Sequence, residues 1–371
     1  MKQAVVIGSG ICGLATAEVL STNFEKVLVY EGAPPAQAHH LHVLLGSGQD
    51  CLERIFPGIK SQLLEAGCPL IDWAQDTVWE NQDGSFPRYP SSVKTFSMSR
   101  MLLTSLMRQR VQRKNIEFIQ QRVSGLGEVD GSLIVLAGGQ NFPLETFLGR
   151  GVYKEEQFPL KLTYRSLVFK QSDLKLEGPL QYYFQIDPPR ARTGGVITPI
   201  EGQRVMATLI EQEDEFTPCS GLSAYLEKAS KIKSDAFTRI LKDAKPVSEL
   251  YQYRKAFSHR RTLNLEAMPK NVIVLGDALL SLNPVFGQGM TVSLQQAEIL
   301  KELLSRPSFS AESFHRRCQK AGHFAHRLSL LGSHESGLGK RSLRAYLKLC
   351  QRHKALHHLF LRQLHSLRIL P

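Results

Sequence analysis

A glycine-rich turn close to the N-terminus constrains the fold more than any other feature of the 371-residue chain. Residues 4–7 are all apolar, as in a strand buried on both faces of a parallel sheet, and they lead directly into Gly8-x-Gly10-x-x-Gly13. Gly8 permits a tight turn, Gly10 lets the backbone approach a pyrophosphate, and Gly13 lets the following helix pack closely on the strand. A second apolar run at residues 27–30 completes a strand–helix–strand unit. The pattern therefore predicts a dinucleotide-binding site rather than a turn that is merely rich in glycine.

Glu31 stands directly after the second apolar run and 18 residues beyond Gly13. A carboxylate at this point of a dinucleotide-binding unit can accept hydrogen bonds from the ribose hydroxyls. Its negative charge also disfavours a phosphate at the 2′ position of that ribose. We therefore expect Glu31 to bind the ribose of the dinucleotide.

A second strand-to-helix motif indicates which dinucleotide is bound. Residues 272–275 are continuously apolar, Gly276 and Asp277 follow, and Gly287-x-Gly289 opens a further helix. The acid can bind a ribityl hydroxyl, and N–H groups at the start of the helix can stabilise negative charge on a flavin pyrimidine ring. Taken alone, the same residues would fit an ordinary turn with Asp277 as a helix N-cap. Taken with the first motif, they favour FAD.

Four short segments between the two motifs have the pattern of strands, and they indicate an antiparallel sheet because turn residues separate them. The runs are residues 163–169, 181–186, 194–197 and 205–209, and helical spacing is expected over 214–244 and again from residue 290. The predicted fold class is α/β, with a Rossmann-like FAD-binding domain, an inserted and mostly antiparallel substrate-side sheet, and a helical C-terminal region. The predicted boundaries are 1–160 and 245–305 for the FAD-binding domain, 161–244 for the sheet and 306–371 for the C-terminal region.

The chain resembles the FAD-dependent monooxygenases of the aromatic hydroxylase and squalene epoxidase superfamily, first of all in its two glycine motifs. Further segments resemble the branch that contains bacterial polyether epoxidases and related FAD-dependent oxidoreductases. They are Pro35-x-Gln37-x-His39-His40-Leu41-His42, Phe56-Pro57-Gly58, Ser99-Arg100-x-Leu102-Leu103, Pro199-Ile200-Glu201-Gly202, Asp243-Ala244-x-Pro246 and Arg260-Arg261.

This resemblance implies a GR2-type fold in which a sheet covers the flavin ring. It places the pyrophosphate at Gly8, Gly10 and Gly13, the ribose at Glu31, and the ribityl chain and pyrophosphate at Gly276 and Asp277. It places the flavin ring against Pro284, Gly287, Gly289 and Met290, and it makes Arg100 a further FAD contact, since a guanidinium can pair with phosphate oxygens.

The resemblance implies hydroxylation or epoxidation of a hydrophobic small molecule through a flavin C4a-hydroperoxide. The chemistry then belongs mainly to the cofactor, and we assign no catalytic residue. Two alternatives stay open. One is an FAD-dependent reductase or dehydrogenase that does not activate oxygen, and the other is a degenerate FAD-binding protein with a non-catalytic role.

The chain departs from the family pattern in two places. Leu136 stands where the family has an acid, Gln140 where it has an arginine, and His39 also where it usually has an arginine. These changes remove charged groups from the region expected around the cofactor. The source of electrons therefore stays open between NADPH or NADH bound transiently and a separate flavin reductase, because the chain has no second glycine-rich fingerprint.

Several other functions are not expected. His39, His40 and His42 have no nearby acid or cysteine cluster, so we predict no metal site. The six cysteines are scattered without a C-x-x-C pair, which suits a reducing cytoplasm. Trp73 and Trp79 do not form the tryptophan signature of flavin halogenases, so halogenation is not expected. The chain has no run of 18 apolar residues, so no transmembrane helix is predicted.

The net charge of +12 comes almost entirely from the C-terminal region. Residues 306–371 hold 13 lysines and arginines but only two acids, while residues 1–305 are nearly neutral. Leucines and aromatic residues recur there at helical spacing. We predict helices that pack on the rest of the protein; contact with the anionic inner face of a membrane is the open alternative to a purely cytoplasmic location. Nucleic acid is not expected, because no recognition motif accompanies the charge.

Overall fold

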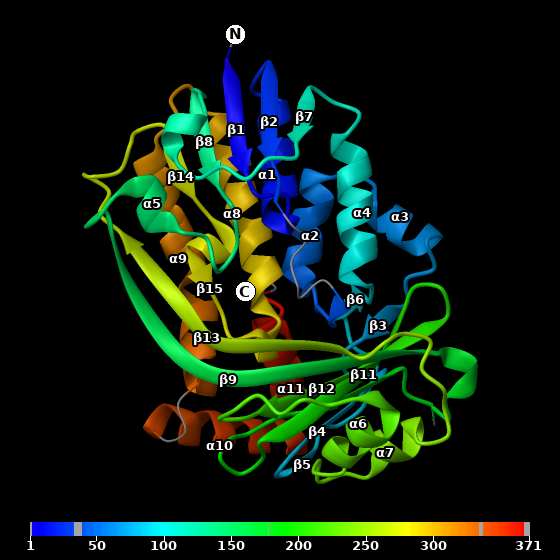
Figure 1. The fold of residues 1–371 in the computed structure, drawn as a ribbon. Helices are drawn as coiled ribbons and strands as arrows, with labels where there is room; N and C mark the ends of the chain where they lie inside the picture. The colour runs from blue at the N-terminus through cyan, green and yellow to red at the C-terminus, as the bar shows by residue number, and fades with distance from the viewer. Residues whose placement is uncertain (1, 33–38, 177, 334–336, 367–371) are drawn as a thin grey trace.

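The computed structural model describes residues 2–32, 39–176, 178–333 and 337–366. A parallel sheet carries the two glycine motifs (Figure 1). Its five strands lie in the order β14-β8-β1-β2-β7, and every neighbouring pair is parallel. Their bounds are β1 (Gln3–Ile7), β2 (Lys26–Tyr30), β7 (Ile116–Ile119), β8 (Leu133–Leu136) and β14 (Val272–Val274). The predicted buried strands at the two ends of the body thus belong to one sheet, in which β8 lies between β1 and β14.

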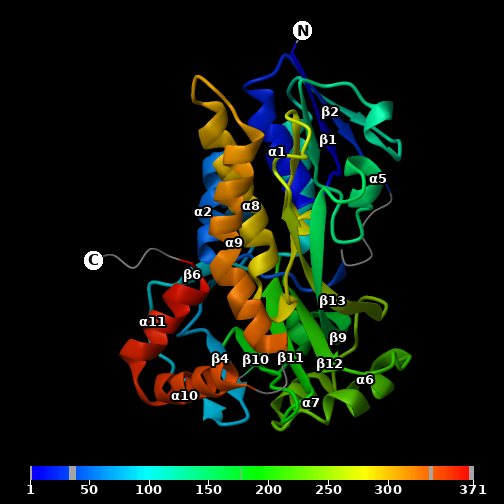
Figure 2. The ribbon, with the colours of Figure 1, turned by 90° about the vertical axis from the view of Figure 1, so that its left-hand side faces the viewer.

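Helices cover this sheet because their apolar residues need a partner surface. Ten of the eleven residues of α1 (Ile11–Ser21) are buried, as expected for a helix enclosed on all sides. α8 (Gln288–Leu304) packs against both α2 (Gly46–Ile55) and α9 (Ala311–Ser333), and the three helices run side by side in Figure 2. Shorter or more distant helices complete this part: α3 (Ile59–Glu65), α4 (Arg100–Val111) and α5 (Leu144–Leu148).

A large, mostly antiparallel sheet lies below the parallel one in Figure 1. Its strand order is β15-β13-β9-β12-β11-β10-β4-β5, and only β10 and β4 pair in parallel. Their bounds are β4 (Thr77–Asn81), β5 (Gly84–Ser85), β9 (Tyr153–Lys170), β10 (Gln181–Phe184), β11 (Thr193–Ile200), β12 (Arg204–Gln212), β13 (Tyr251–Leu263) and β15 (Leu280–Ser281). A separate pair, β3 (Leu70–Asp72) and β6 (Lys94–Phe96), joins the two layers. The predicted mixture of a Rossmann-like sheet and an antiparallel sheet is confirmed.

The structure also corrects two predictions, one on the bounds of the large sheet and one on a helix. It is not one continuous insertion, because β4 precedes residue 161 and β13 follows residue 244, while β9 crosses the predicted boundary at 160/161. β13 lacks an apolar run, and its pairing with β9 along almost its whole length supplies the backbone hydrogen bonds instead. The helix predicted over 214–244 is wrong in part, since only α6 (Gly221–Ala229) and α7 (Ala236–Leu241) form there.

The C-terminal region packs against the rest of the protein, as predicted. Figure 2 shows α10 (Leu338–Arg352) and α11 (Lys354–Leu364) beside the large sheet, at the end that carries β4 and β5. Their buried residues Leu347, Leu361 and Leu364 form one apolar cluster with Trp73 and Trp79. Within the described ranges, no helix combines the length and the apolar character needed to cross a membrane.

Candidate functional site

A cavity of about 1030 Å³ opens where the two sheets and the C-terminal helices meet. This volume is at the upper end of the range of small-molecule sites, which usually enclose about 300–1,000 Å³. Its lining begins at the carboxyl ends of the parallel strands, where open α/β sheets bind their ligands. It continues over β9, β10, β12 and β13 and ends at α10 and α11.

The three glycines of the first motif have different roles. Gly8 has a φ of +114°, and a Cβ atom on it would lie 2.4 Å from the carbonyl oxygen of Ala137. A Cβ atom on Gly13 would lie 1.8 Å from the carbonyl oxygen of Gly8, so both positions are required by packing. A Cβ atom on Gly10 would meet no heavy atom within 4 Å, and Gly10 lines the cavity. Gly10 thus leaves the N-terminus of α1 open to a ligand, which fits an incoming pyrophosphate.

Glu31 lines the cavity beside the glycine turn, and its carboxylate already has a partner. Arg108 on α4 donates to both Glu31 oxygens, at 2.6 and 2.7 Å, and Gln120 donates to the same group. The hydrogen bonds from Arg108 lower the pKa of Glu31 and outweigh the opposing effect of burial. Sequence reasoning missed Arg108, because an arginine on an amphipathic helix carries no signal of its own. Glu31 is therefore held ionised and oriented at the edge of the cavity.

The second motif reaches the same cavity from the other side. Asp277, Pro284, Gly287, Gly289 and Met290 all line it, and Gly287 adopts a φ of +65° as the residue that precedes α8. The carboxylate of Asp277 lies 3.9 Å from the position that a Cβ atom on Gly289 would take. The alternative role for Asp277 as a helix N-cap is wrong, since Leu275 and Gly287 hold the N-cap positions here.

Gly276 lies behind this surface rather than on it. Its φ is +66°, and a Cβ atom would come within 2.9 Å of the sulfur of Cys12 on α1. Gly276 and Gly13 are both absent from the cavity lining. Their role is to let α1 approach the strands closely, which positions the ligand-facing residues of both motifs.

Buried positive charge stands near the altered family segment. Gln140 accepts a hydrogen bond from Nζ of Lys255, and Lys255 also donates to Oγ of Ser281 at 2.5 Å. Burial lowers the pKa of Lys255, and the nearby Asp277 opposes that shift. Arg100 lines the same cavity; burial lowers its pKa as well, and Asp277 again opposes that shift. Lys255 comes from β13, a strand that the sequence pattern did not reveal, and it places a cation beside Gln140, where the family has an arginine.

The opposite end of the cavity is apolar and aromatic. The ring of Trp79 lies 5.0 Å from that of Tyr183 and 5.7 Å from that of Phe360 on α11. Leu343 and Leu347 of α10 complete this wall. The C-terminal helices thus form part of the wall at the apolar end.

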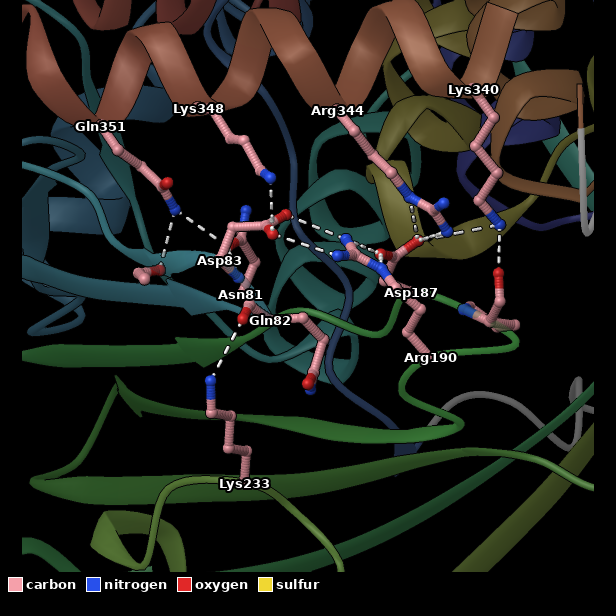
Figure 3. A network of polar contacts seen from close by, with 12 residues as sticks. Asn81, Gln82, Asp83, Asp187, Arg190, Lys233, Lys340, Arg344, Lys348 and Gln351 are labelled. Carbon is pink, nitrogen blue, oxygen red and sulfur yellow. Dashed lines mark hydrogen bonds and ion pairs between the residues drawn. The ribbon is translucent and has the colours of Figure 1, made fainter. Parts of the chain in front are cut away.

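Ion pairs fasten α10 over this end of the cavity, as Figure 3 shows. Lys340, Arg344 and Lys348 follow one another at four-residue spacing, which places them on one face of the helix. Arg344 donates to Asp187 at 2.7 Å, and Lys348 lies 3.2 Å from Asp83. Arg190 donates to both acids, and its hydrogen bonds lower the pKa of Asp83 to about 2. Part of the C-terminal charge therefore anchors the helix to the large sheet.

The three histidines considered for a metal have separate partners. His39 stacks on Tyr251 with ring centres 4.4 Å apart, and Nδ1 of His40 lies 2.9 Å from Oγ of Ser166. Nε2 of His42 lies 3.5 Å from Arg100. Among the residues that the structure describes, no three histidine, cysteine or acidic side chains converge as ligands for a metal ion.

We compared the sequence with protein-family models and with known proteins. No protein-family model matches the chain. Protein Rv3254 of Mycobacterium tuberculosis is 27% identical over 351 residues, which cover 82% of this chain and 73% of that protein.

Solved structures give a clearer answer about the fold. The flavin-dependent brominase Bmp2 superposes with a TM-score of 0.74 at 16% identity, covering 98% of this chain and 93% of that one. PqsL of Pseudomonas aeruginosa, described as a probable FAD-dependent monooxygenase, gives 0.70 at 15% identity over 96% and 99% of the two chains. The oxygenase of 2-methyl-3-hydroxypyridine-5-carboxylic acid gives 0.66 at 17% identity over 90% of each. The fold expected from the sequence resemblance is confirmed: the chain has the fold of the FAD-dependent monooxygenases.

Proposed function

We propose that the protein is an FAD-dependent monooxygenase that hydroxylates or epoxidises a hydrophobic small molecule. The observation that carries this proposal is the single cavity that joins both glycine motifs to an aromatic end. A dinucleotide needs the first end, where helix N-termini and an acid lie together. An apolar substrate needs the second, where the surroundings are dry.

The residues at the first end fit FAD. The N-terminus of α1 at Gly10 would hold the pyrophosphate, and Glu31, oriented by Arg108, would accept hydrogen bonds from the ribose. Asp277 would bind the ribityl chain, and the N-terminus of α8 at Gly287 and Gly289 would face the flavin ring. When bound there, FAD supplies the redox chemistry with molecular oxygen.

The protein itself contributes position and exclusion of water. The dipole of α8 favours negative charge at the flavin ring. Arg100 and Lys255 place two further cations in the lining on the side of Asp277. The aromatic wall and α10 keep solvent away from the substrate, which limits the unproductive loss of activated oxygen. Electrons would come from NADPH or NADH in transient contact, or from a separate flavin reductase.

Anaerobic reduction of the purified holoprotein is the decisive experiment. We expect flavin absorbance in stoichiometric amount, bleaching by NADH, NADPH or a flavin reductase with NADH, and reoxidation by oxygen. With ¹⁸O₂ and a panel of naphthalene, 2-naphthol and geraniol, we expect one labelled oxygen atom in a product.

Two outcomes would contradict the proposal. FAD that none of these donors reduces would indicate a degenerate binding protein. Reduced FAD that is reoxidised by an organic acceptor, without consumption of oxygen, would indicate a reductase or dehydrogenase. A chain purified without flavin, and unable to retain added FAD, would contradict all three flavoprotein functions.

A further inference from the structure

Two polar atoms at the apolar end of the cavity lack the partners that buried groups normally have. His40 is 3% exposed and Tyr164 is 7% exposed, and both side chains line the cavity. Neither Nε2 of His40 nor the hydroxyl of Tyr164 has a hydrogen-bond partner within the described part of the chain. A buried polar group left without a partner is unfavourable by about 1–3 kcal/mol, so such atoms point to a ligand.

The imidazole of His40 is held in place from behind. Its Nδ1 atom lies 2.9 Å from Oγ of Ser166, and that oxygen lies 2.8 Å from Oγ1 of Thr208. Ser166 on β9 and Thr208 on β12 are directly opposite one another in the sheet, so the backbone ladder sets both hydroxyls. One ring nitrogen is thus used to orient the side chain, and the other has no partner among the described residues.

Tyr164 lies beside this group on the same strand. It is two residues before Ser166, so the two side chains share one face of the sheet. Tyr164 pairs with Tyr253 of β13, and the ring centres of His40 and Tyr164 are 6.4 Å apart. The Tyr164 hydroxyl and the free nitrogen of His40 therefore belong to one small polar patch within an aromatic wall.

Both groups of this patch are uncharged at neutral pH. Burial lowers the pKa of His40 to about 4, and burial raises the pKa of Tyr164 well above its ordinary value. Arg100 and Asp277 act electrostatically on Tyr253, whose ring centre lies 6.0 Å from that of His40, so the patch borders the charged side of the cavity without carrying a charge itself. A neutral imidazole and a phenol can each donate or accept a hydrogen bond, and neither compensates the burial of a full charge.

We infer that His40 and Tyr164 form a recognition site for an uncharged hydroxyl or carbonyl oxygen on an otherwise apolar substrate, with Ser166 and Thr208 as positioning residues. This inference rests on the proposed function, because it names the chemical class of molecule that the same cavity takes. The site selects both the substrate and its orientation, since one anchored oxygen sets which carbon atoms lie toward the cofactor end.

Equilibrium dialysis of the holoprotein tests the inference without turnover. The probes are 2-naphthol, naphthalene and 2-naphthoate, which share one ring system and differ in the oxygen group. We expect 2-naphthol to bind most tightly. Tyr164→Phe should weaken 2-naphthol by about 3- to 10-fold and leave naphthalene unchanged, as expected for one hydrogen bond. His40→Leu should act in the same direction.

Tyr225→Phe is the matched control. Tyr225 is fully buried, but it belongs to a separate cluster outside the cavity and donates to the carbonyl oxygen of Ala207. It should leave all three affinities unchanged. Tyr164→Phe removes a hydroxyl that has no partner in the described ranges, so folding is not endangered and the variant remains informative.

Clear results would overturn the inference. The first is a ratio of 2-naphthol to naphthalene affinity that stays unchanged in both Tyr164→Phe and His40→Leu. The second is tighter binding of 2-naphthoate than of 2-naphthol by the wild type. Flavin content, read from absorbance in the same samples, separates these results from failure of the proposed function. Loss of flavin concerns the first end of the cavity, whereas loss of discrimination with flavin retained concerns the patch.

Discussion

The two ends of the cavity are built in different ways. The backbone surface of the cofactor end comes from two short continuous segments, residues 8–13 and 276–290, and single side chains such as Glu31, Arg100 and Lys255 complete it. The apolar end collects single side chains from distant segments, such as His40, Trp79, Tyr164 and Phe360. One end thus depends on local conformation, and the other on which side chains the tertiary fold brings together.

This difference explains why the sequence predicts the cofactor end of the cavity but not the apolar end. A turn that presents backbone N–H groups needs glycine at set positions, because only glycine allows the required φ or the close approach. An apolar wall can be made from many combinations of leucine, tryptophan, tyrosine and phenylalanine, so no spacing is required. The same freedom lets substrate specificity vary while the cofactor end stays the same.

The most direct test of the cofactor end compares a glycine that is needed for packing with the glycine that faces the ligand. Gly13→Ala should lower the free energy of unfolding by about 3 kcal/mol, because its Cβ atom would overlap the carbonyl oxygen of Gly8. Gly10→Val has an open site and a φ of −72°, so the apoprotein should keep its stability. Its side chain would instead block the helix N-terminus and weaken FAD binding by about 100-fold or more.

Urea unfolding of both apoproteins and fluorescence titration with FAD measure these effects. Equal destabilisation by the two substitutions would remove the distinction between packing and ligand-facing positions. Normal FAD affinity in Gly10→Val would show that the dinucleotide does not approach α1 at all.

The apolar end can be tested by weakening the ion pairs that hold α10 in place. Asp187 is largely buried and accepts hydrogen bonds from Arg190 and Arg344. Asp187→Asn removes the carboxylate that pairs with Arg344 and one of the two that pair with Arg190, and it should lower the free energy of unfolding by about 2 kcal/mol. Naphthalene should also bind more weakly, because α10 forms part of the wall at the apolar end, whereas FAD affinity should not change.

Asp214→Asn is the control for this prediction. Asp214 pairs with Lys161 and Arg192 in an exposed position, so its replacement should leave stability and both affinities unchanged. If the two variants behave alike, the ion pairs of α10 are ordinary surface pairs that do not hold the cavity closed.

The smallest expected effect concerns the pH dependence contributed by Glu31. Arg108 lowers the pKa of Glu31 in the folded state, so the carboxylate stabilises the fold above its unfolded pKa of about 4.3. That contribution is lost as the pH falls through the lower folded value. Glu31→Gln should therefore be less stable than the wild type by about 1 kcal/mol at pH 7, and the difference should shrink toward pH 3.

Urea unfolding of the two apoproteins at several pH values checks this prediction. A constant difference between them from pH 7 to pH 3 would mean that Glu31 is not the titrating group. FAD titration at pH 7 adds a second readout, since loss of the ribose acceptor should weaken binding without preventing it.

Particular residues show how far sequence reasoning reached. Gly10, Glu31, Asp277, Gly287 and Gly289 were placed by motif, and the structure brings all five to one cavity. Gly13 and Gly276 were grouped with them but lie behind the surface, because a motif does not distinguish a residue that contacts a ligand from one that lets two elements pack. Whether these residues bind FAD remains a prediction.

Other residues could not have been found in advance. Lys255 and Arg108 are single charged residues on elements with no motif, and their importance depends on Gln140 and Glu31, which are more than 70 residues away in the chain. The C-terminal charge was visible as a composition. Its use as an anchor for α10 was not visible, because Asp83 and Asp187 lie on other segments.

The sequence by itself determined the cofactor end and the class of fold, because tight turns and buried parallel strands restrict which residues can stand at each position. Only the tertiary structure decided the substrate end. It paired β13 with β9, laid α10 and α11 across the aromatic wall, and left His40 and Tyr164 facing the cavity. Those outcomes depend on contacts between distant segments, and side-chain packing and ion pairing over such distances leave no periodic or spaced signal in the chain.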